Sequence, residues 1–94
     1  MTTQQIEQTL LSILNRHDAG RIAIFGSRAR GDWGPGSDLD VLVDFRKTKS
    51  LLRLIGIERE LTESLGIKVD LLTEKAISPY MIDQIKADLK VLQQ

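Results

Sequence analysis

The stretch that decides how this chain folds runs from Phe25 to Asp44 and reads FGSRARGDWGPGSDLDVLVD. Residues 39–45 form a largely apolar, branched run that predicts a β-strand, with Asp38 just before it and Asp40 at its second position. Because successive side chains of a strand alternate between its faces, Asp38 and Asp40 project from the same face. Leu39, Val41 and Val43 project from the other. The stretch therefore predicts a strand with one apolar face and two adjacent carboxylates on the opposite face.

The carboxylate pair needs a compensating charge, because two like charges placed close together repel each other. A divalent cation such as Mg²⁺ supplies that charge and is usually shared with a phosphate-bearing substrate. The turn at Gly26 and Ser27 is the candidate site for this phosphate, through its backbone N–H groups and the Ser27 hydroxyl. Arg28 and Arg30 follow directly and are placed to add positive charge.

Composition limits the size of the molecule and the kinds of partner that it has. We expect 94 residues to form one domain over residues 1–94. Thirteen basic and thirteen acidic residues leave no net charge, which disfavours a nucleic-acid polymer as the main partner. Without cysteine and with the single His17, any metal must be bound by oxygen. No apolar run suits a signal peptide or a membrane span, so we expect a soluble, cytoplasmic protein.

Helical spacing of apolar residues alternates along the chain with short branched runs. The resulting order, α-β-(short α)-β-α-β-α, indicates the α/β class. We expect a small mixed sheet of three strands, or slightly more, with flanking helices. The expected helices are at residues 3–17, 27–30, 51–65 and from 78 onward, and the expected strands are at 21–25, 39–45 and 67–72.

Two details of the predicted helices bear on the fold. Gly56 lies inside the long third helix, which indicates either that another backbone passes close by or that the helix is locally weak. The last helix begins with a cap and a proline at its first position. Its predicted start is Ser78-Pro79, and its predicted apolar stripe is Ile82, Ile85, Leu89 and Leu92.

A third carboxylate, Asp70, lies on the polar face of the strand predicted at residues 67–72. If the two acidic strands are neighbours, Asp38, Asp40 and Asp70 converge. Two aspartates that bind Mg²⁺, beside a third that shares a metal or accepts a proton, suit in-line attack of a hydroxyl on a nucleotide phosphate. Asp44 continues the same face, but at the strand end we expect it to be solvated or ion-paired.

These motifs together resemble the minimal nucleotidyltransferase (MNT) family, a compact branch of the DNA polymerase beta superfamily. The pattern of that family is glycine-serine, a spacer, Asp-x-Asp and a distant third aspartate, and no part of it is missing here. The segments that carry the resemblance are 25–31 (FGSRARG), 37–44 (SDLDVLVD) and 66–71 (GIKVDL).

The resemblance implies the nucleotidyltransferase fold and a role for each motif residue. Gly26 and Ser27 would bind the nucleotide triphosphate, and Asp38 and Asp40 would ligate magnesium. Asp70 would complete the acidic triad as a metal ligand or as a base.

The resemblance also implies a biological setting. Such proteins are commonly the antitoxin partners of helical HEPN ribonuclease toxins, and they can transfer AMP from ATP to a toxin tyrosine. We therefore expect an Mg²⁺-dependent nucleotidyltransferase whose partners are ATP and a cognate HEPN toxin. Two alternatives stay open: an antitoxin that masks the toxin without turnover, and an enzyme that nucleotidylates a small hydroxylated molecule.

For four residues near these motifs, both a functional and a structural interpretation stay open. Arg28 and Arg30 either contact phosphate or form structural ion pairs with the nearby aspartates. Trp33 stacks on a base, meets a partner, or packs its loop against the domain. Tyr80 contacts a partner or covers the sheet.

Overall fold

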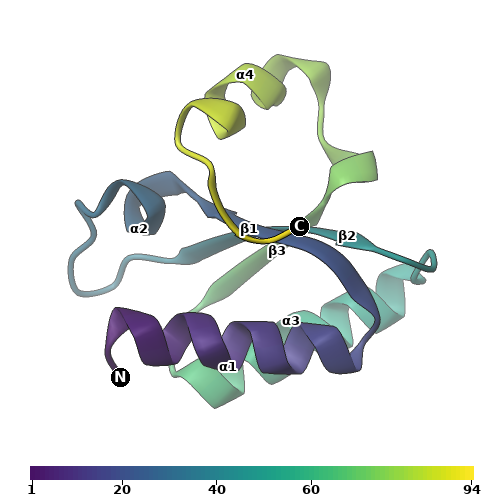
Figure 1. The fold of residues 1–94 in the computed structure, drawn as a ribbon, viewed down its shortest axis with the longest axis horizontal. Helices are drawn as coiled ribbons and strands as arrows, with labels where there is room; N and C mark the ends of the chain where they lie inside the picture. Colours follow the sequence, from purple (N-terminus) through teal and green to yellow (C-terminus); the bar gives the residue numbers. More distant parts are fainter.

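Helices lie on both sides of a four-stranded mixed sheet (Figure 1). The computed structural model describes residues 1–94. The arrangement confirms the predicted α/β class. In chain order the elements are α1 (Thr3–Arg16), β1 (Ala19–Phe25), α2 (Gly26–Arg30), β2 (Leu39–Phe45), α3 (Leu51–Leu65), β3 (Val69–Thr73), the 3₁₀ turn η1 (Glu74–Ala76), α4 (Pro79–Ala87) and β4 (Lys90–Gln93).

The strand order in the sheet is β3-β2-β1-β4. β1 runs antiparallel to both β2 and β4, whereas β2 and β3 are parallel. The predicted mixed sheet is thus confirmed, and the long helix α3 makes the crossover that a parallel β2–β3 pair requires. This topology makes the two strands that carry the predicted site aspartates direct neighbours.

The main core fills the space between the sheet and the helices α1 and α3, which lie on the same face (Figure 1). Alternation along β2 sends Leu39, Val41 and Val43 to this face, as predicted. The helices contribute residues at helical spacing, which is why each of them presents one apolar stripe. The remaining members of the 14-residue buried cluster are Ile6, Leu10, Ile13, Leu14, Ala19, Ile22, Ile24, Ile57, Leu61, Leu65 and Val69.

Local signals at the helix ends agree with the sequence. Thr2 caps α1 through a capping box, in which its Oγ1 accepts a hydrogen bond from the backbone N–H of Gln5 at 3.1 Å. Gly66 ends α3 in the left-handed conformation with φ of 67°. Ser78 caps α4, and a proline occupies the first turn of that helix.

The predicted length of the last helix is wrong. The helix α4 ends at Ala87, and Leu89 and Leu92 lie outside it although they continue its apolar spacing. Residues 90–93 instead form β4, which pairs with the open edge of β1. The side chains of Gln93 and Asn15 hold the end of β4 with hydrogen bonds of 2.8 and 2.9 Å. Pairing of backbone groups along β1 therefore outweighs the local helical pattern.

The solvent side of α3 resolves the question about Gly56. No atom lies within 4 Å of the position that a Cβ would take there, so no other backbone approaches this glycine. The helix buries Ile57 and Leu61, whereas Leu51 and Ile55 are exposed. None of the helices combines the length and the apolar character that crossing a membrane would require.

Candidate active site

Two of the three aspartates singled out in the sequence are paired across neighbouring strands. Asp40 of β2 and Asp70 of β3 occupy opposite positions in the parallel register. Their neighbours Leu39, Val41 and Val69 are buried in the core beneath α1 and α3. Because strand side chains alternate, Asp40 and Asp70 lie on the opposite face, which carries α4. The predicted convergence of these two carboxylates is therefore present in the fold.

Asp38 lies one residue before β2 and is half-buried, as Asp40 is. Its Oδ2 is 3.9 Å from Nζ of Lys68, the residue that precedes β3. The charge of Asp38 also helps to raise the pKa of Asp40, so the two carboxylates are electrostatically coupled. The three aspartates therefore gather at the end of the sheet where β2 and β3 begin.

The arrangement of the three aspartates disfavours the ionised form of Asp40. Partial burial raises the pKa of Asp40 above its ordinary value, and the negative charges of Asp70 and Asp38 raise it further. A hydrogen bond with Asp70 acts in the same direction, whereas the positive charge of Arg30 opposes it. Any cation placed between Asp40 and Asp70 would relieve this repulsion.

The donor set fits Mg²⁺ only in part when the protein side chains are taken alone. No group of three or more His, Cys, Asp or Glu side chains is arranged to hold a metal ion. Mg²⁺, however, is usually bound through one or two carboxylates together with substrate phosphates, rather than by a complete protein cage. The adjacent carboxylates of Asp40 and Asp70 meet that requirement, with Asp38 nearby.

The backbone at Gly26 passes directly beside Asp40. Gly26 has φ of +74°, and a Cβ at this position would overlap Oδ2 of Asp40. Glycine suits this position because the left-handed conformation strains other residues and because a Cβ would displace the carboxylate of Asp40. Ser27 follows in the first turn of α2, and its carbonyl oxygen accepts the backbone N–H of Gly31 at 3.0 Å. The start of the glycine-serine turn therefore lies directly against the carboxylate of Asp40.

A cavity of about 190 Å³ opens between Gly26, Asp40 and α4. Ser27, Asp38 and Asp70 do not line it. The turn and the sheet supply one wall, which includes Gly26, Asp40 and Arg30. The other wall comes from α4 and the residue that ends it. Its residues are Met81, Gln84, Ile85 and Asp88. The candidate reaction would take place in this cavity.

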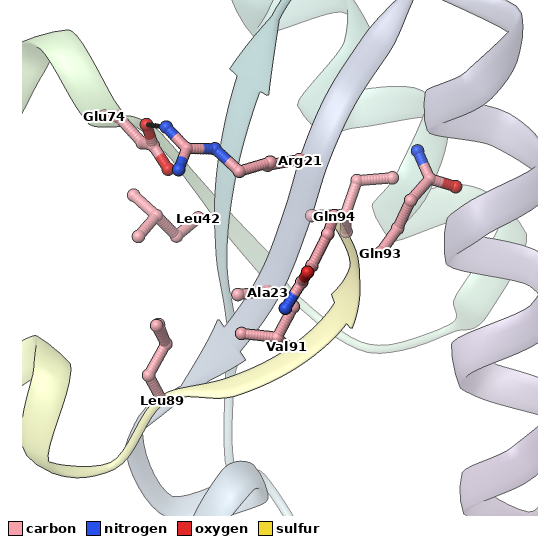
Figure 2. Close-up of a pocket in the computed structure, with 9 residues that line it drawn as sticks. Arg21, Ala23, Leu42, Glu74, Leu89, Val91, Gln93 and Gln94 are labelled. Atoms are coloured by element: carbon pink, nitrogen blue, oxygen red, sulfur yellow. Dashed lines mark hydrogen bonds and ion pairs between the residues drawn. The ribbon is translucent and has the colours of Figure 1, made fainter.

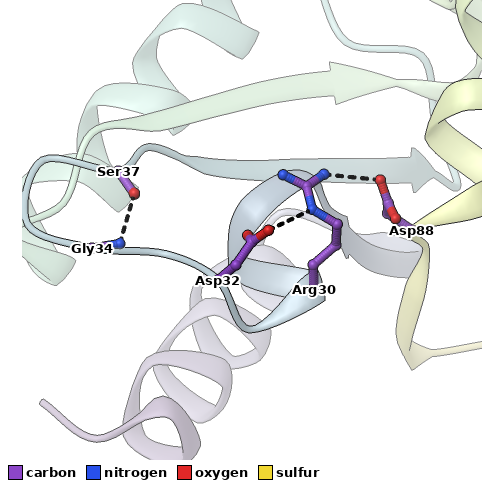
Figure 3. A network of polar contacts seen from close by, with 5 residues as sticks. All are labelled: Arg30, Asp32, Gly34, Ser37 and Asp88. Atoms are coloured by element: carbon purple, nitrogen blue, oxygen red, sulfur yellow. Dashed lines mark hydrogen bonds and ion pairs between the residues drawn. The ribbon is translucent and has the colours of Figure 1, made fainter.

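Arg30 lies at this cavity and is held by two carboxylates (Figure 3). Its Nε donates to Oδ2 of Asp32 at 3.1 Å, and its Nη1 donates to Oδ2 of Asp88 at 3.0 Å. The ion pair with Asp32 agrees with the structural alternative for Arg30, whereas sequence reasoning did not identify Asp88. Asp88 is 58 residues from Arg30, so no local pattern signals the contact. The structure thus shows ion pairs for Arg30, and also places it beside the predicted nucleotide site.

Arg28 points to a different part of the molecule. Its Nη2 donates to the carbonyl oxygen of Ser37 at 3.3 Å, and its guanidinium carbon lies 4.4 Å from the centre of the Trp33 ring. Both side chains line a small hollow beside α1, together with Leu10 and Leu39. In this structure Arg28 therefore braces the loop that carries Trp33, and it does not line the cavity at Asp40.

A larger hollow, of about 320 Å³, lies elsewhere between the sheet and the C-terminal segment (Figure 2). Its floor includes Ala23 and Leu42, and an ion pair of 2.7 Å between Arg21 and Glu74 lies at its margin. None of the predicted site residues lines it. Size does not select the site, because a hollow of about 600 Å³ beside α3 is larger than either of these. Asp40 and Gly26 place the candidate chemistry in the smaller cavity.

Comparison with known proteins agrees with this geometry. Residues 6–92 match the family model described as a nucleotidyltransferase domain. A Methanocaldococcus jannaschii protein, provisionally named a protein adenylyltransferase, is 42% identical over 85 residues, which cover 90% of this chain and 91% of that protein. The protein adenylyltransferase MntA of Thermococcus cleftensis is 36% identical over 81 residues, covering 82% of each chain.

A solved structure shows the same fold. It is a complex of a tri-AMPylated HEPN toxin of Shewanella oneidensis with an MNT antitoxin. The matching chain aligns with a TM-score of 0.80 at 22% identity, over 97% of this chain and 71% of its own length. The family match and the relatives above 30% identity, together with the paired carboxylates beside a glycine-serine turn, give one conclusion. This chain belongs to the nucleotidyltransferase domain family and is a nucleotidyltransferase enzyme.

Proposed function

We propose that this enzyme is an antitoxin that transfers AMP from ATP, with Mg²⁺, to a tyrosine hydroxyl of a cognate HEPN toxin. The observation that carries the proposal is the pairing of Asp40 with Asp70, directly beside the backbone of Gly26. The relatives named protein adenylyltransferase support AMP as the transferred group. The Shewanella complex, in which an AMPylated HEPN toxin binds an MNT antitoxin, supports the choice of partner.

Each motif residue has a distinct task in this proposal. Asp38 and Asp40 hold Mg²⁺, and Asp70 acts as a further ligand or as the base. The turn at Gly26 and Ser27 binds the triphosphate, since the missing side chain lets backbone N–H groups approach the anion. When bound, Mg²⁺ supplies charge neutralisation at the phosphate oxygens.

The transfer step is an in-line displacement at the α-phosphorus of ATP. The acceptor hydroxyl oxygen forms a bond to that phosphorus, the bond to pyrophosphate breaks, and pyrophosphate leaves. The hydroxyl proton passes to the carboxylate of Asp70 or to water. Burial of Asp40 beside Asp70 favours this chemistry, because a partly desolvated site strengthens electrostatic interactions with the phosphates.

The proposed acceptor is a second protein. Within residues 1–94, every helix and strand belongs either to the sheet or to the layers that cover it, so none remains to present an acceptor. Met81, which lines the cavity at Asp40, is 47% exposed, and Tyr80 beside it on α4 is 96% exposed. An incoming polypeptide therefore has access to the site.

The double substitution Asp38→Asn and Asp40→Asn tests the enzymatic part of the proposal. We expect it to abolish Mg²⁺-dependent AMP transfer to the HEPN toxin while the chain stays folded, because two repelling carboxylates are removed. Intact-protein mass measurement of the toxin reads out the transfer. Asp44→Asn is the matched control, since Asp44 lies further along β2 and is 3.9 Å from Nη2 of Arg21.

The same experiment separates the two alternatives. If the double variant neutralises the toxin as strongly as the wild-type chain, the antitoxin acts by binding and the enzymatic proposal fails. If the wild-type chain leaves the mass of the toxin unchanged but labels a small hydroxylated compound in the presence of ATP, the acceptor is not a protein. Loss of activity in the Asp44→Asn control would contradict the placement of the site.

A further inference from the structure

Arg30 is the only basic side chain that lines the cavity at Asp40. It comes from the last position of α2, directly after the glycine-serine turn. Of the two carboxylates that hold it, Asp32 is only two residues away, in an exposed loop. Asp88 belongs to the opposite wall of the cavity, at the end of α4. The pair formed by Arg30 and Asp88 therefore spans the cavity.

The geometry of the guanidinium leaves one donor group free. Nε and Nη1 are engaged by Asp32 and Asp88, and Nη2 makes no hydrogen bond within the chain. In Figure 3 the nitrogen that faces Asp88 and the free terminal nitrogen point to different sides. Because a guanidinium is planar, two bonds at fixed positions also fix the direction of its third nitrogen. The free edge of Arg30 is therefore oriented before any ligand binds.

We infer that Asp88 is a positioning residue for nucleotide binding, which holds Arg30 across the cavity so that its free Nη2 donates to a phosphate oxygen of ATP. The inference rests on the proposed function, and it adds a residue that lies outside the glycine-serine and aspartate motifs. Arginine suits this task because its fixed donors match the oxygens of a phosphate group.

Asp88 is better placed for this role than Asp32. The side chain of Asp88 is 28% exposed, whereas that of Asp32 is 61% exposed, so the bond to Asp88 is the less solvated of the two. Asp32 is only two residues from Arg30, so its bond does not tie Arg30 to another element. Asp88 instead fixes Arg30 relative to α4, and it lines the cavity itself. Removal of Asp88 should therefore disturb the orientation of Arg30 more than removal of Asp32.

The test is the affinity of the full chain for ATP with Mg²⁺, measured by calorimetry, compared with its affinity for adenosine. Asp88→Asn preserves the size of the side chain and should weaken ATP binding about twofold to fivefold, as expected for the loss of one partly exposed charged contact. Adenosine, which carries no phosphate, should bind as it does to the wild-type chain. Asp32→Asn, the matched control, should change ATP binding less than twofold.

A double-mutant cycle with Arg30→Gln shows whether Asp88 acts through Arg30. We expect Asp88→Asn to have no further effect in the Arg30→Gln background. Asp88→Glu retains the charge and should recover part of the affinity, which also serves if the asparagine variant folds poorly.

Wild-type affinity for ATP in Asp88→Asn, or an equal loss for ATP and adenosine, would overturn the positioning role while leaving the proposed function standing. The positioning role would also be overturned if Asp88→Asn weakened ATP binding in the Arg30→Gln background as much as in the wild-type chain. Absence of ATP binding by the wild-type chain would overturn both.

Discussion

The two faces of the sheet differ in what they bury. The face beneath α1 and α3 belongs to a cluster of 14 buried apolar residues, with no buried polar or charged side chain. The face beneath α4 has a buried cluster of only three residues, Ala23, Leu42 and Ile85. It also carries the aspartates and both cavities described above. One face is closed and apolar, and the other is thinly covered and charged.

This difference shows how the chain tolerates a repulsive site. Burial of apolar side chains against α1 and α3 supplies most of the stability, since each fully buried aliphatic side chain contributes about 1.5–3 kcal/mol. The opposite face can then hold carboxylates whose mutual repulsion works against folding. The alternation of β2 makes this possible, because the same strand serves the core with Val41 and the site with Asp40.

The comparison predicts that equal truncations on the two faces have unequal effects on stability. Leu61→Ala should lower the free energy of unfolding by roughly 3–5 kcal/mol, because Leu61 is fully buried in the larger cluster. Ile85→Ala should lower it by only about 2 kcal/mol, because Ile85 lines an open cavity. Urea denaturation of both variants measures the difference.

Equal losses for Leu61→Ala and Ile85→Ala would show that both faces contribute similarly to stability. Leu42→Ala provides a second measurement on the α4 face, from a strand rather than a helix.

A substitution at Gly26 should affect both the fold and the chemistry. In Gly26→Ala the new Cβ overlaps Oδ2 of Asp40, so Asp40 must move. We expect a loss of roughly 1–3 kcal/mol in unfolding free energy from the left-handed backbone, and loss of AMP transfer. Denaturation and toxin mass together measure these effects.

Gly31→Ala separates strain from overlap in that experiment. Gly31 also has a positive φ of 85°, but no atom lies within 4 Å of its Cβ position. It should lose a comparable amount of stability and retain AMP transfer. Equal loss of transfer in both variants would contradict the role of close approach at Gly26.

The repulsion at Asp40 predicts a stabilising substitution on the charged face. The folded-state pKa of Asp40 is raised by burial and by Asp70 and Asp38, so its unfavourable contribution appears as pH rises through that pKa. Without divalent cations, Asp40→Asn should therefore raise Tm at neutral pH. The gain should shrink at acidic pH, where Asp40 is protonated in both the folded and the unfolded chain. Thermal unfolding of both proteins across this pH range measures the effect.

Asp44→Asn is again the control, because Asp44 faces Arg21 rather than another carboxylate. It should give no gain in Tm. A Tm for Asp40→Asn that stays equal to or below that of the wild-type chain at neutral pH would contradict the electrostatic interpretation.

The sequence predicts the features of this fold that depend on short-range patterns. Alternation in β2 places Asp40 opposite the core, and the same rule places Asp70, so their convergence follows once β2 and β3 are neighbours. The glycine-serine turn is likewise local. A few residues and the two-residue periodicity of a strand are enough to predict these parts of the structure.

Features that depend on distant partners escape the same reasoning. Leu89 and Leu92 continue the spacing of α4, yet the chain leaves the helix because β1 offers an edge for pairing. The contact between Arg30 and Asp88 joins positions that no periodicity connects. Arg28 and Arg30 are two residues apart, but only Arg30 reaches the cavity, because Arg28 packs on Trp33.

The smallest effect on stability is expected on the solvent side of α3, which faces neither side of the sheet. Gly56→Ala should raise the free energy of unfolding by about 0.5–1 kcal/mol, because alanine favours the helix and its Cβ meets no neighbour. AMP transfer should be unchanged, since Gly56 lies on the helix that covers the apolar face. Urea denaturation measures the gain. A loss of stability would show that the backbone at Gly56 requires glycine for a reason other than space.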